Sequence, residues 1–337
     1  MSIILTGYDH GTAPLDIVGR GQEALMRDRR FRTAVRVWFF AVCFCFLMGT
    51  AAAYASGSVL LSDSSDAQPV PESEWTPPDL QHLTEADPPQ LKVLAVAQGE
   101  VGYRAGPDYS NKYSQWYDGS DSPWCTEFYT WCTAAADEKW GTDYSGTLFP
   151  RKGVVHECYW GFIDRNQFVG ADGKNYEGEE QWLPGSDHYL LPHEYVPHAG
   201  DVMWVYLYGG DVCPDHTTLV EGVSRDGSGS ILVHVIEGNI NSQVQRAVYA
   251  LDDPCIVGFG TPETRVYTCL RLDSRYGGVN LLREDLLTLG YDASPRYIQR
   301  LDQRTRDALR QFQADHGLPV TGRQDIDTRA ALDAELR

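Results

Sequence analysis

The amino-acid sequence predicts an α+β fold in which one buried helix packs against a mostly antiparallel sheet. After Trp124 the apolar residues recur at spacings of three and four, as in a helix with one buried face: Phe128, Trp131, Cys132 and Ala135. From Val202 onward, short runs of β-branched and aromatic residues alternate with glycine-rich turns, which is typical of successive strands. At 337 residues, the chain is long enough for two domains.

The N-terminal part contains two segments of different character. Residues 1–36 mix glycine, arginine and acidic side chains without sustained periodicity, and we expect a cytoplasmic tail there. Residues 37–61 carry no charge and are apolar enough to enter a bilayer, and arginines precede them, so the N-terminus is expected to stay cytoplasmic. The segment is either a transmembrane signal-anchor or a signal peptide cleaved near Ala55, because Ala53-Tyr54-Ala55 has the small-x-small form of a cleavage site.

The next segment, residues 62–90, is rich in proline and acidic side chains. Such a composition predicts an extended linker that does not contribute to a core. The domains that follow it are expected outside the cytoplasm, either anchored to the cell membrane by the single N-terminal helix or secreted.

The charge and the cysteines exclude some classes of function. The formal net charge is −19, which argues against a nucleic-acid partner. The spacing of the eight cysteines resembles neither a zinc site nor a disulfide framework, although one bridge between Cys213 and Cys255 stays open. Asp118 and Asp121 supply too few oxygen ligands for a calcium site. We therefore expect no metal and no cofactor.

The secondary structure is expected in a definite order. A short amphipathic helix runs from Leu91 to near Gly102, and a second begins at Cys125 and fades after Ala136. Residues 140–197 are expected to form loops and short helices. Strands are then predicted over residues 202–208, 217–220, 231–236, 243–249 and 256–260.

Cys125 lies where a turn-rich loop ends and the buried helix begins. The unpaired N–H groups and the positive end of the helix dipole stabilise a thiolate at such a position, and the thiolate is the nucleophilic form. A buried cysteine is also often only a small core side chain, and this stretch alone does not decide between the two interpretations.

A general base and an acid can be placed near this cysteine. His216 precedes one predicted strand and Glu237 ends the next, so both can project from one edge of the sheet. An imidazole would take the thiol proton and later protonate the leaving amine, while the acid would fix the orientation of the imidazole. His234 lies within a strand, where a structural role is common, and the remaining candidates lie in irregular loops: His156, His188, His193 and His198.

Four short motifs occur in order along residues 91–263. They are Pro123-Trp124-Cys125 at the start of an aromatic helix, Ala199-Gly200-Asp201, Asp215-His216, and Glu237-Gly238-Asn239. Together they resemble the CHAP domain of peptidoglycan amidohydrolases. The resemblance implies a papain-like fold related to the NlpC/P60 peptidases. It also implies Cys125 as nucleophile, His216 as base, Glu237 as the residue that orients the base, and Asn239 as an assisting polar residue.

The sequence departs from the CHAP pattern in two places. Thr126-Glu127 stands where members usually carry small or apolar residues, and a carboxylate near the nucleophile opposes thiolate formation unless it points to solvent. The region 140–197 is also longer than in the usual member.

Residues 277–337 show helical spacing interrupted by turns, which predicts a small three-helix bundle. Its motifs resemble the three-helix peptidoglycan-binding domain found beside wall enzymes: Leu289-Gly290-Tyr291, Thr305-Arg306-Asp307-Ala308-Leu309, Gly317-Leu318 and Thr328-Arg329-Ala330-Ala331-Leu332. Leu301-Asp302 replaces the usual Asp-Gly before the second helix. Peptidoglycan is the implied partner, and a bundle that only packs on the catalytic domain is the alternative.

These resemblances imply an exported peptidoglycan hydrolase that cleaves an amide bond through a cysteine acyl-enzyme. The bond is either the one cut by an N-acetylmuramoyl-L-alanine amidase or one within a stem peptide or cross-bridge, as cut by an endopeptidase. The alternative is a catalytically decayed wall-binding or scaffolding protein, which the carboxylate of Glu127 would indicate.

Overall fold

The computed structural model describes residues 70–208, 213–295 and 300–337. The predicted tail, the apolar segment 37–61 and the first part of the predicted linker lie outside the described residues. Within the described ranges, no helix combines the length and the apolar character needed to cross a membrane.

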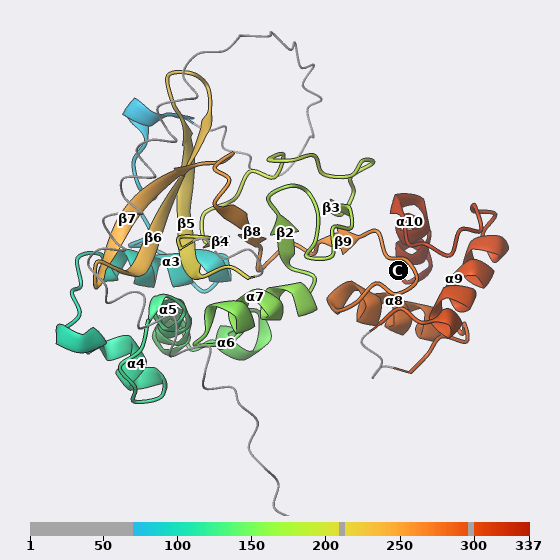
Figure 1. The fold of residues 1–337 in the computed structure, drawn as a ribbon, viewed down its shortest axis with the longest axis horizontal. Coiled ribbons are helices and arrows are strands. Elements are labelled where there is room, and N and C mark those ends of the chain that lie inside the picture. The colour runs from blue at the N-terminus through green and yellow to red at the C-terminus, as the bar shows by residue number, and fades with distance from the viewer. Residues whose placement is uncertain (1–69, 209–212, 296–299) are drawn as a thin grey trace, which may run out of the picture. The chain divides into compact units, whose positions relative to one another are not determined.

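The centre of the fold is a seven-stranded sheet with the order β2-β8-β4-β5-β6-β7, to which β1 adds beside β5 (Figure 1). The β1–β5 pair is parallel and the other pairs are antiparallel. The strands are β1 Val70–Pro71, β2 Phe168–Gly170, β4 Val202–Val205, β5 His216–Arg225, β6 Ile231–Ile240, β7 Gln243–Ala250 and β8 Ile256–Gly260. The predicted combination of helices with an antiparallel sheet is confirmed.

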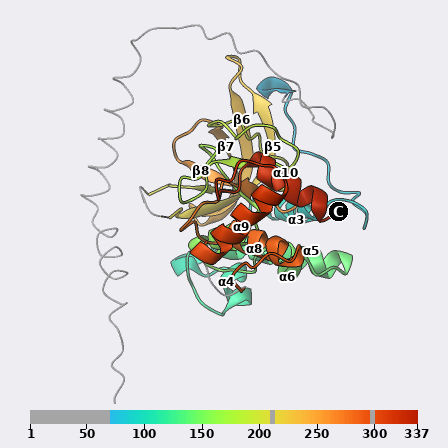
Figure 2. The same ribbon diagram turned by 90° about the vertical axis from the view of Figure 1, so that its right-hand side faces the viewer.

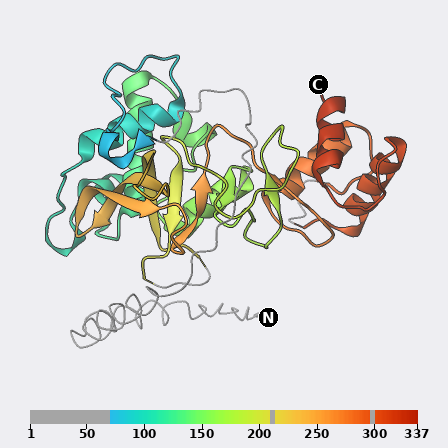
Figure 3. The ribbon, with the colours of Figure 1, turned by 90° about the horizontal axis from the view of Figure 1, so that it is seen from above.

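The strands β6 and β7 form a long hairpin, drawn in yellow to orange in Figures 1 and 3. Asn241 and Ser242 turn the chain between the two strands, both with positive φ (53° and 58°). The hairpin matters for the site because it places residues of β7 directly beside Glu237.

Helices cover the sheet below the strands in Figure 1. They are α3 Pro89–Glu100, α4 Lys112–Tyr117, α5 Cys125–Trp140, α6 Tyr144–Thr147 and α7 Val155–Asp164, with short 3-10 turns at Glu72–Glu74 and Pro107–Tyr109. α5 packs against α3, β5 and β6. Trp124, Phe128 and Tyr129 are at most 2% exposed there, so the start of α5 belongs to the main hydrophobic core.

One helical prediction needs correction and another is confirmed. α5 continues past Ala136 to Trp140, where Gly141 ends it in a left-handed conformation (φ 67°). α6 and α7 lie within residues 140–197, where loops and short helices were predicted. The strand β2 in the same region was not predicted. Gly161 in the interior of α7 lets the helix approach Pro150, because a Cβ there would lie 2.5 Å from Pro150 Cβ.

The second half of the predicted linker is also different from the expectation. Val70–Pro71 forms a strand beside β5, the Trp75 ring stacks on the His234 ring at 3.6 Å, and Leu80 is 7% exposed. Isolated apolar residues among prolines give no periodic signal, so composition alone could not reveal that they pack on the domain. His234 donates to or accepts from the Ser224 hydroxyl at 2.8 Å, which confirms its structural role.

The C-terminal residues form the predicted three-helix bundle, drawn in orange to red in Figure 2. Its helices are α8 Gly277–Thr288, α9 Gln303–Asp315 and α10 Ile326–Glu335. Asp302 and Asp325 cap α9 and α10 by accepting hydrogen bonds from Thr305 N (3.0 Å) and Thr328 N (2.9 Å). The unusual Leu301-Asp302 therefore supplies both a core residue and a helix cap.

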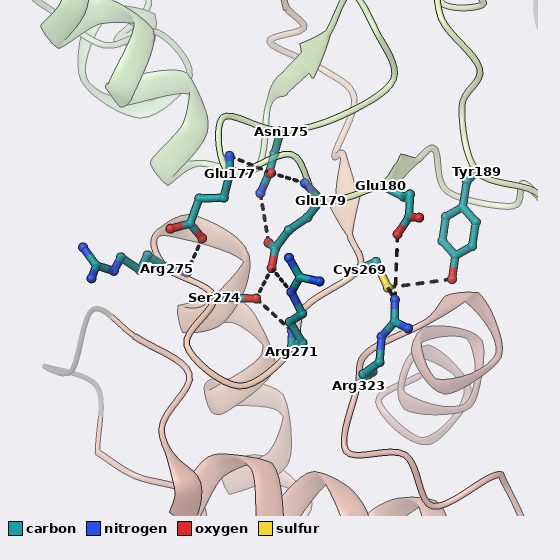
Figure 4. Close-up of polar contacts among 10 residues, drawn as sticks. All are labelled: Asn175, Glu177, Glu179, Glu180, Tyr189, Cys269, Arg271, Ser274, Arg275 and Arg323. Carbon is teal, nitrogen blue, oxygen red and sulfur yellow. Dashed lines mark hydrogen bonds and ion pairs between the residues drawn. The ribbon is translucent and has the colours of Figure 1, made fainter. Parts of the chain in front are cut away.

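The bundle is joined to the α/β part by a polar network rather than by a free linker (Figure 4). Glu179, 4% exposed, accepts hydrogen bonds from Asn175 and from the Ser274 hydroxyl, and Arg271 lies 3.8 Å away. The backbone N–H of Arg275 donates to Glu177 at 2.8 Å. A buried carboxylate with three partners is costly to separate from them, so this interface is a firm one.

Packing continues the interface beside this network. The small sheet of β3 Gln181–Trp182 and β9 Tyr267–Thr268 shares an apolar cluster with Leu281 of α8 and Ile326 of α10. At the start of α8, a Cβ on Gly277 would lie 2.2 Å from the carbonyl oxygen of Ile163. Only glycine allows so close an approach of α8 to the end of α7.

Candidate active site

Cys125 is the first residue of α5 and is 5% exposed. The start of this helix is fixed against the sheet, because the hydroxyls of Thr126 and Thr217 lie 2.9 Å apart across α5 and β5. Amides in the first turn of a helix have no partner within the helix, and the helix dipole is positive there. The predicted position of the cysteine at a helix N-terminus is confirmed.

Gly238 explains how β6 comes close to this helix. A Cβ at Gly238 would lie 2.8 Å from Cζ3 of Trp124 and 3.0 Å from Cβ of Phe128. The glycine of Glu237-Gly238-Asn239 therefore allows the strand to touch the first turn of α5. This contact brings the neighbouring Glu237 toward the site.

His216 begins β5, and Glu237 lies on β6 across from Thr218. Both are buried, with 3% and 2% of the residue exposed. Nε2 of His216 lies 3.3 Å from Oε2 of Glu237, which is ion-pair distance, although the angle is not that of a hydrogen bond. The structure thus brings the predicted base and acid together at neighbouring ends of β5 and β6, beside the start of α5.

The electrostatics favour a charged pair of cysteine and histidine. Burial opposes ionisation of Cys125, but the contact with His216, its positive charge and the Thr217 backbone N–H lower the pKa of the thiol. Burial likewise opposes the imidazolium, yet Cys125 and Glu237 raise the pKa of His216 to about 9. Both shifts therefore favour the thiolate–imidazolium pair more than in the isolated side chains.

Glu237 is held by residues that the sequence did not single out. Gln245 Nε2 donates to its Oε1 at 3.0 Å, and the Tyr249 hydroxyl donates to its Oε2 at 3.2 Å. Burial raises the pKa of Glu237, but the contacts with His216 and Gln245 outweigh it and the net direction is downward. The sequence could not pair Gln245 with Glu237, because that pairing depends on the register of the β6–β7 hairpin, which shifts between Glu237 and Ile240.

Asn239 is not joined to the other predicted site residues. It lies two residues beyond Glu237 on β6 with φ 68°, and its buried Oδ1 has no hydrogen-bond partner. Within the described ranges, no hydrogen bond connects it to Cys125, His216 or Glu237. Its assisting role remains only an implication of the family resemblance.

Glu127 does not point to solvent, which the sequence had left open. It is 4% exposed and accepts hydrogen bonds from the Ser114 and Ser122 hydroxyls. Burial raises the pKa of this carboxyl, although the two serines oppose the shift. The residue ties α4 and the loop before Cys125 to α5, which sequence spacing could not reveal because its partners lie on a separate loop and helix.

The other two predicted motifs hold the framework of the site. Asp215 closes the turn before His216 by accepting hydrogen bonds from the backbone N–H groups of Leu207 (2.7 Å) and Tyr208 (2.9 Å). Asp201 accepts from the Tyr195 hydroxyl (2.7 Å) and from His198 N (2.9 Å). Neither carboxylate contacts the cysteine–histidine pair, so their roles are structural.

The remaining cysteines contrast with Cys125. All those in the described part of the chain are free thiols, so the bridge between Cys213 and Cys255 is not formed. Burial raises the pKa of Cys132, Cys158, Cys255 and Cys269, which is the direction opposite to that of Cys125. Over the residues that the structure describes, no cluster of three or more His, Cys, Asp or Glu side chains could hold a metal ion.

Comparison with known families gives a match at the C-terminal end of the chain. Residues 275–332 match the family described as "Putative peptidoglycan binding domain". The C-terminal bundle is similar to peptidoglycan-binding domains. The match supports peptidoglycan as a partner and a cell-wall-associated protein. It does not reach residues 91–263, whose papain-like CHAP assignment stays a prediction.

Two further comparisons add little. No curated protein matches the chain. A solved structure titled "The crystal structure of Ly7917" is 16% identical with a TM-score of 0.26; the match covers 51% of this chain and 62% of the length of that one. A likeness this weak does not bear on the fold or the activity.

Proposed function

We propose that this protein is a peptidoglycan hydrolase that cleaves an amide bond through a cysteine acyl-enzyme. The observation that carries the proposal is the meeting of Cys125, His216 and Glu237 at the start of α5, with the thiol pKa lowered and the imidazole pKa raised. The peptidoglycan-binding match at residues 275–332 supports the choice of substrate. The enzyme would act outside the cytoplasm, where the wall lies.

Each group has a defined part in the first half of the reaction. The Cys125 thiolate attacks the carbonyl carbon of the amide, and the carbonyl π electrons move to the oxygen. Backbone N–H groups at the start of α5, including that of Cys125, would stabilise the oxyanion. As the C–N bond breaks, the His216 imidazolium gives its proton to the leaving amine, and a thioester on Cys125 remains.

The second half regenerates the thiol. His216, now neutral, takes a proton from water while the water oxygen attacks the thioester carbonyl. Collapse of the tetrahedral intermediate breaks the C–S bond, releases a carboxylic acid and restores the thiolate–imidazolium pair. Glu237 keeps the imidazole in one orientation through both halves and stabilises its positive charge.

The alternative of a catalytically decayed wall-binding protein depended on Glu127. That carboxylate is engaged by Ser114 and Ser122, and the pKa of Cys125 is lowered despite its presence. No specific observation therefore favours the decayed protein.

Digestion of purified sacculi by the full chain, with mass analysis of the released fragments, tests the proposal. New amino and carboxyl termini should appear with the wild type and with Cys132→Ala, a buried cysteine of the same helix, but not with Cys125→Ala. Fragments ending at the muramic acid side would indicate an amidase, and fragments cut within a peptide would indicate an endopeptidase. Equal release by Cys125→Ala would overturn the assignment of the nucleophile.

A further inference from the structure

Both carboxylate oxygens of Glu237 are occupied by side chains of β7. Gln245 Nε2 donates to Oε1 at 3.0 Å, and the Tyr249 hydroxyl donates to Oε2 at 3.2 Å. Oε2 is also the oxygen that lies 3.3 Å from Nε2 of His216. Since Glu237 is 2% exposed, water cannot easily replace a donor that is lost.

The orientation of the Gln245 amide is itself fixed. Gln243 Nε2 donates to Gln245 Oε1 at 2.7 Å, so the amide nitrogen of Gln245 is directed to Glu237. Residues 243, 245 and 249 have odd numbers in one strand and therefore share a face of β7. The strand thus presents two donors to Glu237, and Gln243 orients one of them.

We propose that Gln245 and Tyr249 are positioning residues of the candidate active site, which hold the Glu237 carboxylate ionised with Oε2 directed to His216. The proposal rests on the proposed function for the identity of the site. It extends that function to two residues that lie outside every motif discussed above.

We expect the loss of a donor to Glu237 to change the pKa of the Cys125 thiol. A buried carboxylate that loses a donor is harder to ionise, so its pKa rises and its charge stabilises the imidazolium less. When Glu237 stabilises the His216 imidazolium less, the imidazolium in turn stabilises the Cys125 thiolate less, and the pKa of the thiol rises. Neither residue touches the sulfur, so a change in thiol reactivity would have to pass through Glu237 and His216.

The other titratable groups around this carboxylate do not change charge in the pH range of interest. Besides His216 from β5, which in turn interacts with Cys125 of α5, the carboxylate faces Tyr249 from β7 and, at longer range, Tyr208 after β4. Burial raises the pKa of both tyrosines, so both stay neutral between about pH 5 and 9. A shift seen in that range therefore reports on the cysteine, histidine and glutamate.

The test is the rate of Cys125 alkylation against pH in the full chain, measured by mass mapping for the wild type, Tyr249→Phe and Gln245→Met. Losing one hydrogen bond to a charged group should move the midpoint of the Cys125 profile upward by about 0.5–1 pH unit. Tyr195→Phe is a matched control, because it also removes a hydroxyl that donates to a buried carboxylate, that of Asp201, away from the site. Its profile should equal that of the wild type.

The outcomes separate this inference from the proposed function. If the midpoint of the wild-type Cys125 profile is low and His216→Ala raises it, the proposed site stands. Unchanged profiles in Tyr249→Phe and Gln245→Met would then overturn this inference alone. If the wild-type Cys125 profile has no low midpoint that His216→Ala raises, the proposed site is overturned and this inference with it. Thermal unfolding shows which variants are folded, and if Tyr249→Phe does not fold, Gln245→Met decides the question.

Discussion

Gly238 of β6 lies against Trp124, the residue immediately before the candidate nucleophile, so closely that a Cβ would come within 2.8 Å of Cζ3 of the indole. Trp124 and the adjoining Phe128 are at most 2% exposed and cannot move aside easily. This contact couples the position of Glu237 to the start of α5. It gives the family-like Glu-Gly-Asn sequence a physical reason in this chain.

Gly238→Ala should therefore lower the free energy of unfolding by about 1–3 kcal/mol, because the added methyl group overpacks the core. It should also reduce turnover by moving Glu237 away from His216. Gly99→Ala is the control, since no atom lies within 4 Å of the Cβ it would add. Denaturant titration of the two variants measures the difference, and equal stability would mean that the contact can relax.

The position of Cys125 at a helix start and the run of strands after Val202 were predictable from the sequence, because periodicity and turn residues are local signals. The close approach of His216 and Glu237 followed from strand order. The contacts of Gln245, Tyr249 and Glu127 did not follow, because they depend on strand register and on packing between segments distant in the chain.

The same reason explains the interface between the bundle and the α/β part. Residues 264–276 fall between the two predicted domains, and the sequence alone indicates only a short join there. In the structure Ser274 and Arg271 approach a buried glutamate, and Gly277 touches the backbone of α7. No local pattern in the sequence marks a residue that is small only because another segment lies against it.

Gly277→Ala tests this interface. The added Cβ would lie 2.2 Å from the carbonyl oxygen of Ile163, so the variant should unfold at a lower temperature than the wild type. The neighbouring Gly278→Ala is the matched control, because its Cβ would meet only Leu270 and Asn166 side chains at 3.4 Å or more. Calorimetry should show a lower midpoint, or two separate transitions, for Gly277→Ala alone.

If Gly277→Ala and Gly278→Ala both melt at the temperature of the wild type, the stability of the protein does not depend on the contact between α8 and α7. The result also decides how wall binding should be tested. With a firm interface, deleting residues 277–337 would expose apolar residues of the α/β part, so loss of sacculus binding in such a truncation would not report on binding alone.

Asp201 predicts a pH dependence of stability. Burial raises its pKa to about 6, although the hydrogen bonds from Tyr195 and His198 oppose the shift. An unfolded aspartate titrates near ~3.9, so between these values the folded chain binds more protons and its stability falls as the pH rises. Relative to Asp201→Asn, which does not titrate, the wild type should lose on the order of 2–3 kcal/mol between about pH 4 and pH 7.

Denaturant titrations of both proteins at several pH values measure this difference. The variant keeps a side-chain oxygen that can accept from Tyr195, so the comparison isolates the titration from the loss of the contact. Parallel stability curves over the whole range would show that the carboxyl of Asp201 titrates normally in the folded chain.

Thiol reactivity should distinguish Cys125 from the other cysteines. Brief alkylation of the folded chain at about pH 6 should label Cys125 ahead of Cys132, Cys158 and Cys269, because its pKa alone among these is lowered. His216→Ala should remove most of this preference. Peptide mapping after alkylation gives the order, and labelling that is equal among buried cysteines would speak against the pair.

A search for the covalent intermediate tests directly whether Cys125 is the nucleophile. The full chain is mixed with a soluble peptidoglycan fragment, quenched in acid during turnover, and analysed by intact mass and peptide mapping. We expect an acyl adduct on the Cys125 sulfur in the wild type and in Cys132→Ala, and no adduct in Cys125→Ala or His216→Ala. Continued hydrolysis by Cys125→Ala, with no adduct on the wild-type thiol, would contradict this assignment of the nucleophile.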